Sequence, residues 1–345
     1  MVIGALFPLT GGLSTYGEVA QNSALLAMQD INDAGGINGR KIQIDFQDHK
    51  CNPKEATSIF EQLVNAKQIK IFTSVACSGT VLSIAPLLEQ NNALLLGTIT
   101  TTPKISGISP FVFRNWASDD QQARLYAKEI KQKNYRKIGI IHEQTDYAQG
   151  LVLSIQKYLS DTGIEFIVES FSSDTTDVKT QLTKLKAANA DAYFLSPQTV
   201  IAGDLVLKQM KELDFKPTVF FVNDNVMKAT ELNQKYSDIL DRAISGDYIL
   251  PKNEENIAFL KKYKKTYGKD CTQENICVSV YDAIKILADA IENNEHSAKG
   301  VQEYLSNLSY DGLSGHISFD ENNDRKDATY SLFVIKNGTG MLIAS

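Results

Sequence analysis

Apolar residues along the chain recur with two spacings, one typical of buried strands and one typical of helices with a single apolar face. In the first third of the sequence, short apolar runs predict strands and the longer periodic stretches between them predict helices: strands at 2–8, 41–48, 69–75 and 93–97, and helices at 16–34, 55–65 and 81–90. Gly35 and Gly36 follow the first helix, where a left-handed cap is expected. Strands that alternate with helices in this order predict a parallel sheet with helices on both faces.

The same alternation starts again near residue 120. The second series contains helices at 120–133, 150–161, 178–188 and 202–213, and strands at 137–142, 165–171, 192–195 and 218–222. Further helices at 253–268 and 276–293 and strands at 316–319 and 331–335 follow. Because 345 residues exceed what one ordinary core holds, we predict an α/β protein of two lobes, each built on its own sheet.

Composition and charge exclude several classes of function. The net charge is −6 and the pI is about 5.4, which argues against a nucleic-acid partner, since such proteins need a basic surface. Although 43% of the residues are hydrophobic, no uncharged apolar run reaches the roughly 18 residues that a membrane-spanning helix needs. We expect a monomer that diffuses freely in water.

The first residues do not read as a secretory leader. Met1 runs directly into the strand-like Val2–Phe7, without a basic region, a long apolar run and a small-residue cleavage site. We therefore expect either a cytosolic protein or an extracytoplasmic one whose leader is not part of this sequence, a lipoprotein being one form of the latter.

The four cysteines suggest disulfides. Cys51 and Cys77 each follow a predicted strand, so they lie past the same end of neighbouring parallel strands, where a bridge is geometrically feasible. That bridge would stabilise the fold by about 3 kcal/mol on the chain-entropy model. Cys271 and Cys277 are close enough to close a second, shorter loop. The alternative is four buried thiols in a cytosolic protein, and no CxxC or CxxH spacing indicates zinc.

No catalytic or cofactor motif is evident. GxGxxG does not follow the first strand, and neither GxxxxGK[ST] nor GxSxG occurs. The histidines are scattered, without HxxxH or HExxH spacing, at positions 49, 142, 296 and 316. We predict that the protein is not an enzyme and has neither a cofactor nor a bound metal.

Ligands of open α/β sheets bind beyond the carboxyl ends of the strands, so the residues there are the candidate site. In the first half, Ser78 follows a strand and is expected to cap the next helix, whose N-terminus suits a carboxylate. The hydroxyl-rich segment 98–102 follows the next strand and can bind a carboxylate or an ammonium. A plain helix cap and a plain polar loop are the alternatives.

The second half offers a different set of side chains after its strands. Tyr147, Gln198 and Asp224 each follow a predicted strand by a few residues. An acidic side chain in this position can pair with a ligand ammonium. An ordinary turn residue is the alternative for Asp224.

Six short segments occur in an order and spacing that is specific, although each alone is common: residues 11–17, 30–40, 51–53, 77–78, 101–103 and 146–150. Together they resemble the leucine/isoleucine/valine-binding family of type I periplasmic binding proteins. The resemblance covers essentially the whole chain.

This resemblance implies a type I periplasmic binding protein fold, with two Rossmann-like lobes of parallel sheets flanked by helices and a ligand held between them. The N-terminal lobe would comprise 1–117 plus 249–322, and the C-terminal lobe 118–248 plus 323–345. Three hinge crossings are expected near 116–118, 245–247 and 322–324, where the residues are polar or include glycine.

The resemblance also implies roles for individual residues. Ser78 and Thr101 match positions that hold a ligand carboxylate, and the backbone carbonyl of Ile99 and the carboxylate of Asp224 match groups that hold an ammonium. Tyr147 matches a tyrosine of the second lobe. Tyr16 matches the aromatic residue that lines the side-chain pocket. Cys51 and Cys77 match the two cysteines of the family disulfide.

This chain departs from the family pattern at three positions. Gln198 stands where leucine binders carry tyrosine, Asp224 is shorter than the usual glutamate, and Ile99 is bulkier than usual. We therefore expect a pocket for a polar side chain or for a ligand of another size.

The function implied is that of an extracytoplasmic substrate-binding protein of an ABC uptake transporter, which delivers a small zwitterionic ligand to a membrane permease. An amino acid, branched-chain or otherwise aliphatic or polar, is the expected ligand. The alternatives are a ligand-sensing receptor domain of the same fold, and a binder of an amide, urea or an aromatic acid.

Overall fold

The computed structural model describes residues 1–294 and 297–343, so His296 lies outside the described residues. Its internal contacts divide the chain into two compact units, each of them discontinuous in sequence. Unit 1 comprises Met1–Ser118 and Leu250–Thr329, and unit 2 comprises Asp119–Ile249 and Tyr330–Ser345. The chain therefore passes from one unit to the other after Ser118, Ile249 and Thr329.

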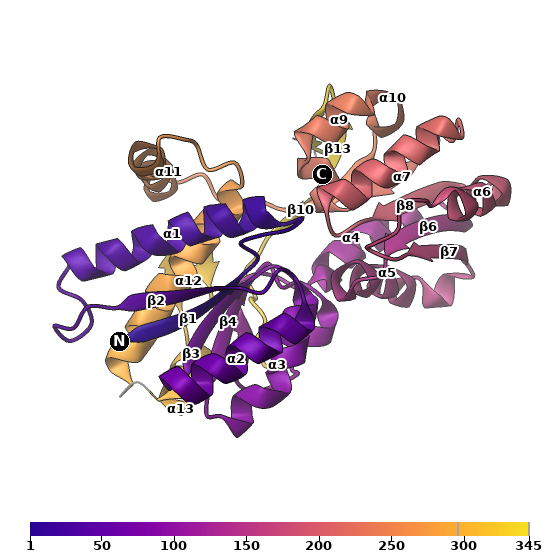
Figure 1. Ribbon diagram of the computed structural model, residues 1–345. Coiled ribbons are helices and arrows are strands. Elements are labelled where there is room, and N and C mark those ends of the chain that lie inside the picture. The colour runs from indigo at the N-terminus through magenta and orange to yellow at the C-terminus, as the bar shows by residue number, and fades with distance from the viewer. Residues whose placement is uncertain (295–296, 344–345) are drawn as a thin grey trace. The chain divides into compact units, whose positions relative to one another are not determined.

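Unit 1 is built on a parallel sheet with the strand order β2-β1-β3-β4-β5. The first four strands in this order are labelled in Figure 1. The strands are β1 (Val2–Phe7), β2 (Gln43–Asp48), β3 (Ile71–Val75), β4 (Leu94–Thr98) and β5 (Val112–Arg114). Its helices are α1 (Ser14–Asp33), α2 (Pro53–Lys67), α3 (Ser78–Gln90), α11 (Glu254–Tyr267), α12 (Glu274–Asn293) and α13 (Ala298–Ser306), with a short hairpin of β11 (Tyr310–Gly312) and β12 (Gly315–Ile317).

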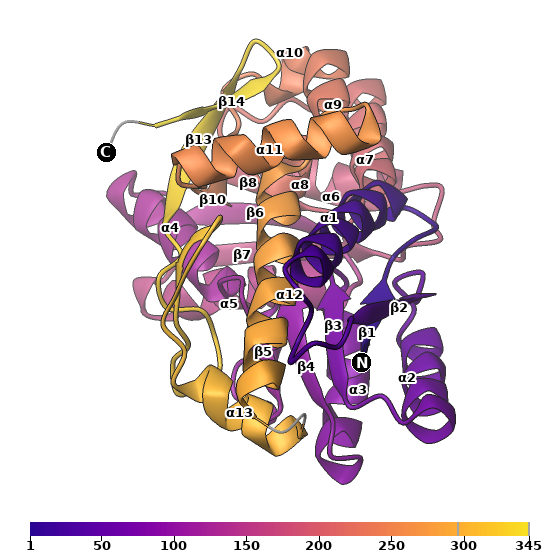
Figure 2. The same ribbon diagram turned by 90° about the vertical axis from the view of Figure 1, so that its left-hand side faces the viewer.

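Helices cover both faces of this sheet because its strands are apolar on both sides. Along β1, Ile3 and Phe7 join the core beneath α1 and α12, whereas Leu6 joins the core beneath α2 and α3. The long helix α12 lies against α1 and β4, as Figure 2 shows. The result is a doubly covered sheet whose strand ends are held from both sides.

Unit 2 is built on a mixed sheet with the strand order β14-β13-β10-β9-β8-β6-β7. Its strands are β6 (Lys137–Glu143), β7 (Glu165–Phe171), β8 (Ala192–Ser196), β9 (Phe220–Val222), β10 (Ile244–Tyr248), β13 (Tyr330–Lys336) and β14 (Thr339–Leu342). The five strands β7, β6, β8, β9 and β10 run parallel to one another. In contrast, β13 pairs antiparallel with both β10 and β14. The prediction of a parallel sheet therefore holds for all but this edge of unit 2.

The helices of unit 2 also lie on both faces of its sheet. They are α4 (Asp119–Gln132), α5 (Asp146–Tyr158), α6 (Lys179–Ala188), α7 (Val200–Glu212) and the short α8 (Asp224–Lys228), α9 (Thr230–Lys235) and α10 (Ser237–Leu240). Ile140 of β6 packs with residues of α4 and α5, whereas the adjacent Ile141 packs with residues of α6 and α7. Alternate side chains of one strand thus serve two cores.

Two of the expected crossing segments lie inside a unit. Residues 245–247 belong to β10, where each pairs with a residue of β13. Residues 322–324 are bonded to unit 1, since Asn322 and Asn323 accept backbone hydrogen bonds from Gly107 and Arg114. Backbone pairing, which the local sequence does not reveal, moves these crossings to Ile249 and Thr329.

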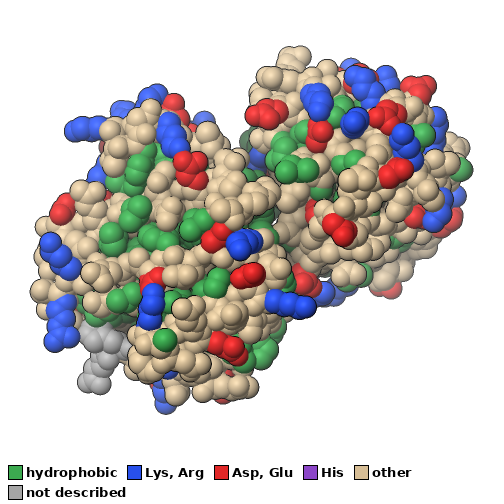
Figure 3. Space-filling view, in the orientation of Figure 1, with side chains coloured by type: hydrophobic (Ala, Val, Ile, Leu, Met, Phe, Trp, Pro, Cys, Tyr) green, Lys and Arg blue, Asp and Glu red, His purple; other side chains and the backbone are tan. Residues whose placement is uncertain are grey.

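The surface of each unit carries charges of both signs. On the face shown in Figure 3, basic and acidic side chains are interspersed over both units. Among the helices that the structure describes, none has the length and apolar character that crossing a bilayer requires.

Both expected disulfides are present. The Cα atoms lie 5.3 Å apart in Cys51–Cys77 and 6.6 Å apart in Cys271–Cys277. Cys51 lies beside the fully buried His49, whose Nδ1 accepts a hydrogen bond of 3.0 Å from the Cys51 N–H. Burial lowers the pKa of His49 to about 4, so the ring is neutral at ordinary pH.

A buried ion pair joins distant segments of unit 1. The guanidinium of Arg114, which is 0% exposed, donates to both carboxylate oxygens of Asp324, at 2.5 and 2.8 Å. It also donates to the carbonyl oxygens of Thr100 and Thr102, at 3.0 and 2.9 Å, and to Ser106 Oγ at 2.7 Å. The five donors of one side chain therefore fix the loop after β4 against residue 324.

Replacing Arg114 should destabilise unit 1 strongly. Arg114→Met leaves the Asp324 carboxylate buried without its partner, and we expect the free energy of unfolding to fall by about 3–5 kcal/mol. Arg114→Met combined with Asp324→Leu should cost less than the single change, because no charge is then left unpaired. Urea unfolding measures these values.

The matched control is Lys67→Met, which removes the half-exposed Lys67–Asp45 ion pair of the same unit. Its cost should stay below about 1 kcal/mol. A cost for Arg114→Met as small as that of the control would contradict the role of the buried pair.

His49 should make unit 1 less stable in acid. Its pKa is lower in the folded than in the unfolded protein. The contribution of the neutral ring to the free energy of unfolding is therefore complete above about pH 6.5 and declines as the pH falls toward 4. When the pH is lowered from 7 to 5, this single group should reduce the free energy of unfolding by about 2 kcal/mol. His49→Asn keeps an acceptor for the Cys51 N–H but does not titrate.

The measurement is the difference in unfolding free energy between the two proteins at each pH. Burial raises the pKa of Asp282 to about 6, so the effect of this residue on stability in acid has the opposite sign. The effect of Asp282 is the same in both proteins and cancels in the difference. Parallel pH profiles for the wild type and His49→Asn would contradict the prediction.

Candidate functional site

The candidate residues lie at the carboxyl ends of strands in both units. In unit 1, Tyr16 follows β1, Ser78 follows β3, and Ile99 and Thr101 follow β4. In unit 2, Tyr147 follows β6, Gln198 follows β8, and Asp224 follows β9. Each unit therefore gathers its own set of side chains along one edge of its sheet.

Ser78 joins the two loops that follow β3 and β4. These strands are neighbours, with Val75 paired to Thr98, and the Thr102 N–H donates to Ser78 Oγ at 3.2 Å. The expected role of Ser78 as the helix cap is wrong, because Cys77 is the N-cap of α3 and Ser78 is the first helical residue. This bond uses Ser78 as an acceptor and leaves its O–H to act as a donor.

The segment after β4 turns sharply at Ile99, whose φ is +50°. A β-branched residue in this left-handed conformation is strained, and such strain is found where a site requires a particular backbone path. The turn places Thr100 over Gly97, where a Cβ would lie 2.5 Å from Thr100 Oγ1. Gly97 is therefore required for this path, which leaves Thr101 only 7% exposed.

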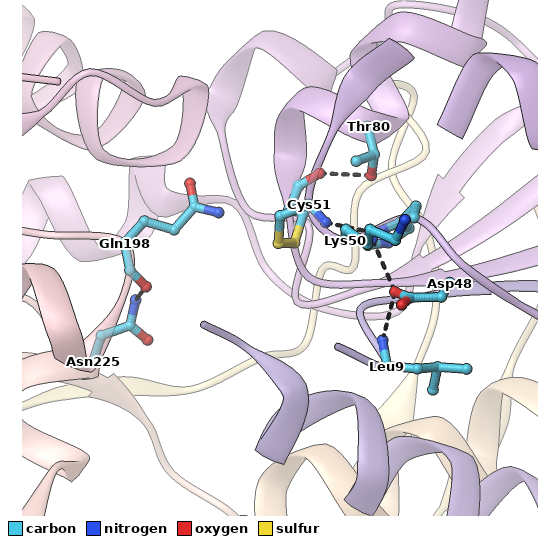
Figure 4. Close-up of a disulfide and its surroundings, with 9 residues drawn as sticks. Leu9, Asp48, Lys50, Cys51, Thr80, Gln198 and Asn225 are labelled. Carbon is cyan, nitrogen blue, oxygen red and sulfur yellow. Dashed lines mark hydrogen bonds between the residues drawn. A yellow bond between two sulfur atoms is a disulfide. The ribbon is translucent and has the colours of Figure 1, made fainter. Parts of the chain in front are cut away.

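Tyr16 is half-buried in the first turn of α1. The adjacent Gly17 allows this turn to approach β1 closely, because a Cβ there would lie 2.1 Å from the carbonyl oxygen of Pro8. The loop before α1 is held by Asp48, which accepts from the Leu9 N–H at 2.9 Å (Figure 4). The position of Tyr16 is thus fixed by the ends of β1 and β2.

The Cys51–Cys77 disulfide fastens the loops that follow β2 and β3, as Figure 4 shows. Backbone φ is positive on both sides of the bridge, at residues 50, 51, 76 and 77. The Thr80 hydroxyl donates to the Cys77 carbonyl oxygen at 2.7 Å. The bridge therefore holds the residue that precedes Ser78 in an unusual conformation.

In unit 2, Tyr147 and Asp224 are in direct contact. The Tyr147 hydroxyl donates to Asp224 Oδ1 at 2.8 Å. Burial raises the pKa of Tyr147 well above its ordinary value, and the carboxylates of Asp224 and Asp119 raise it further. The hydroxyl is therefore a permanent donor, and the Asp224 side chain, 22% exposed, keeps contact with solvent.

Sequence reasoning missed two charged residues beside Asp224. Lys228 Nζ lies 3.2 Å from Asp224 Oδ2 and 2.8 Å from Asp247 Oδ1. Burial raises the pKa of Asp247 to about 6, although the Lys228 ammonium acts to lower it. The spacing of four residues between Asp224 and Lys228 could have indicated their contact, but Asp247 was assigned to a crossing.

Gln198 is fixed by its backbone. Its N–H donates to the buried carboxylate of Glu143 at 2.7 Å, and its carbonyl oxygen accepts from Asn225 Nδ2 at 2.9 Å. Figure 4 shows the second of these bonds. Glu143, at the end of β6, is a further acidic group that the sequence analysis did not identify.

The described residues include one close group of metal-ligand types. Ligand atoms of His49, Cys51 and Cys77 lie within 4.8 Å of one another. The two sulfur atoms are joined in a disulfide and offer no thiolate, so this group does not form a metal site in its oxidised state. The chemistry that the strand ends do offer is hydroxyl donation in unit 1 and negative charge in unit 2.

The sequence matches a family model described as "periplasmic binding protein" over residues 1–339. A leucine-, isoleucine-, valine-, threonine- and alanine-binding protein of Pseudomonas aeruginosa is 26% identical over 336 residues, which cover 94% of this chain and 87% of that protein.

Solved structures show the same fold. A leucine-binding protein from Thermotoga maritima superposes with a TM-score of 0.86 at 22% identity, covering 100% of this chain and 98% of that one. A solute-binding protein of an ABC transporter from R. palustris, in complex with 4-hydroxybenzoate, gives a TM-score of 0.85 at 16% identity, covering 99% and 95%.

The match of the family model to nearly the whole chain and the likeness of fold lead to the same assignment. Proteins of this family bind substrates for transport and are not enzymes. The chain belongs to the periplasmic binding protein family.

Proposed function

We propose that this protein binds an α-amino acid, with unit 1 holding the carboxylate and unit 2 the ammonium. The observation that carries the proposal is the contrast between the two sets of strand ends. Hydroxyl and backbone N–H donors gather after β3 and β4, and a partly exposed carboxylate follows β9. A zwitterion requires both kinds of group.

The carboxylate half of the proposal rests on Ser78 and Thr101. Ser78 stands in the first turn of α3, the end of a helix whose dipole and backbone N–H groups favour an anion. The ion pair of Arg114 with Asp324 holds the carbonyl groups on either side of Thr101. Unit 1 thus presents donors on a loop that is rigid before a ligand arrives.

The ammonium half of the proposal rests on Asp224 and Tyr147. The Tyr147 hydroxyl occupies one oxygen of Asp224 and fixes its orientation. The carbonyl of Ile99, in unit 1, would complete the set of acceptors. Gln198, in place of an aromatic residue, would contact the ligand side chain, and Tyr16 of unit 1 would do the same.

The relatives support both the ligand class and the setting. The Pseudomonas aeruginosa protein is described as a binder of leucine, isoleucine, valine, threonine and alanine. We place this chain outside the cytoplasm, where its two disulfides are stable, as a monomer that delivers its ligand to an ABC permease.

Calorimetric titration with the twenty amino acids tests this proposal. At least one should bind with a Kd below about 100 μM, which corresponds to roughly −5.5 kcal/mol. Asp224→Asn should weaken that ligand by about 2 kcal/mol or more, since a buried ammonium then lacks its counter-charge. Asn keeps the size of the side chain and an acceptor for Tyr147.

The matched control is Asp204→Asn, which removes an acidic group of unit 2 that pairs with Lys235. It should leave the affinity unchanged. The absence of any amino-acid binding, together with binding of benzoate or 4-hydroxybenzoate, would replace the proposal with an aromatic-acid binder. Equal effects of the two substitutions would remove Asp224 from the site.

A further inference from the structure

We propose that Lys228 determines which ligand charge the site accepts, by cancelling one of the two carboxylate charges beside it. This inference rests on the proposed function, since it takes Asp224 to be the partner of a ligand ammonium. It names a specificity-determining residue that lies outside the set of residues matched to the family.

The geometry places Lys228 between two carboxylates. Its Nζ atom lies 2.8 Å from Asp247 Oδ1 and 3.2 Å from Asp224 Oδ2. The side chains are 20% exposed for Lys228, 22% for Asp224 and 9% for Asp247. Since these groups are largely withdrawn from water, their charges are screened less than those of surface ion pairs.

Chain topology brings these three residues together. Asp247 lies on β10, which pairs with β9, and α8 follows β9 with Asp224 and Lys228 at its two ends. Two carboxylates and one ammonium give a formal charge of −1 when all three are ionised. A net charge of −1 over these three groups suits a ligand with one ammonium.

Without Lys228 the same three positions would carry a charge of −2. A ligand with a second ammonium would then be favoured over one with a single ammonium. With Lys228 present, a second ligand ammonium is repelled by the resident one. The lysine would therefore act against basic amino acids, a repulsive element of specificity rather than an attractive one.

The test compares L-norvaline with L-ornithine, which has the same carbon chain and adds one terminal ammonium. Both are titrated at pH 8, where Asp247 is ionised because its pKa is about 6. We expect Lys228→Met to shift the ratio of the two dissociation constants toward ornithine by about tenfold. The reason is that the substitution removes a unit positive charge that repels the second ammonium of ornithine. Asp247→Asn should shift the ratio in the opposite direction.

Two further variants separate charge from structure. Lys228→Arg keeps the positive charge and should keep the wild-type ratio. Lys228→Met combined with Asp247→Asn restores the formal charge of −1 and should bring the ratio back to within about threefold of the wild type, even if absolute affinity falls. Loss of packing alone would not produce this pattern of opposite signs and rescue.

The control is Lys235→Met, which removes a lysine of the same unit that pairs with Asp204 at an exposed position. It should leave the ratio unchanged. If the wild type binds norvaline and the ratio is the same in all variants, the role of Lys228 is refuted while the proposed function stands. If the wild type binds none of the twenty amino acids, the proposed function fails and this inference fails with it.

Discussion

The buried ion pair between Arg114 and Asp324 is the interaction on which the donor half of the site depends. Its partners are 210 residues apart in sequence, and the guanidinium also binds the carbonyl oxygens of Thr100 and Thr102. A charge with no exposure to water persists only where every donor finds an acceptor, and here the acceptors are the backbone of the loop after β4. The requirement to satisfy Arg114 therefore fixes the path of the residues that are proposed to meet the ligand.

Constraints of a second kind hold the ends of β3 and β4. Cys77 and Ile99 both have positive φ, and the Thr102 N–H donates to Ser78 Oγ between the two loops. The disulfide to Cys51 fastens the first loop, and the Arg114 network fastens the second. Strained backbone that is held from several directions does not need to be ordered again when a ligand binds, so less of the binding energy is lost to entropy.

Unit 2 uses charge in place of strain. Tyr147 and Lys228 both contact Asp224, and Asp247 contacts Lys228. The carboxylate that would meet a ligand is therefore oriented by neighbours of the same unit. Burial raises the pKa of Asp247, and the Lys228 ammonium offsets part of this rise. The two units are therefore complementary in chemistry, with neutral donors in one and a partly compensated negative charge in the other.

The sequence by itself determined the alternation of strands and helices, because periodic apolar positions and glycine-rich turns are local signals. It also placed Ser78, Thr101, Tyr147 and Asp224 after strands, and the carboxyl ends of parallel strands lie at one edge of a sheet. Only the tertiary structure decided that residues 245–247 form a strand and that Ser78 is an acceptor rather than a cap. It alone showed that Arg114 pairs with Asp324 and Lys228 with Asp247, because these contacts join segments whose separation in sequence carries no periodic pattern.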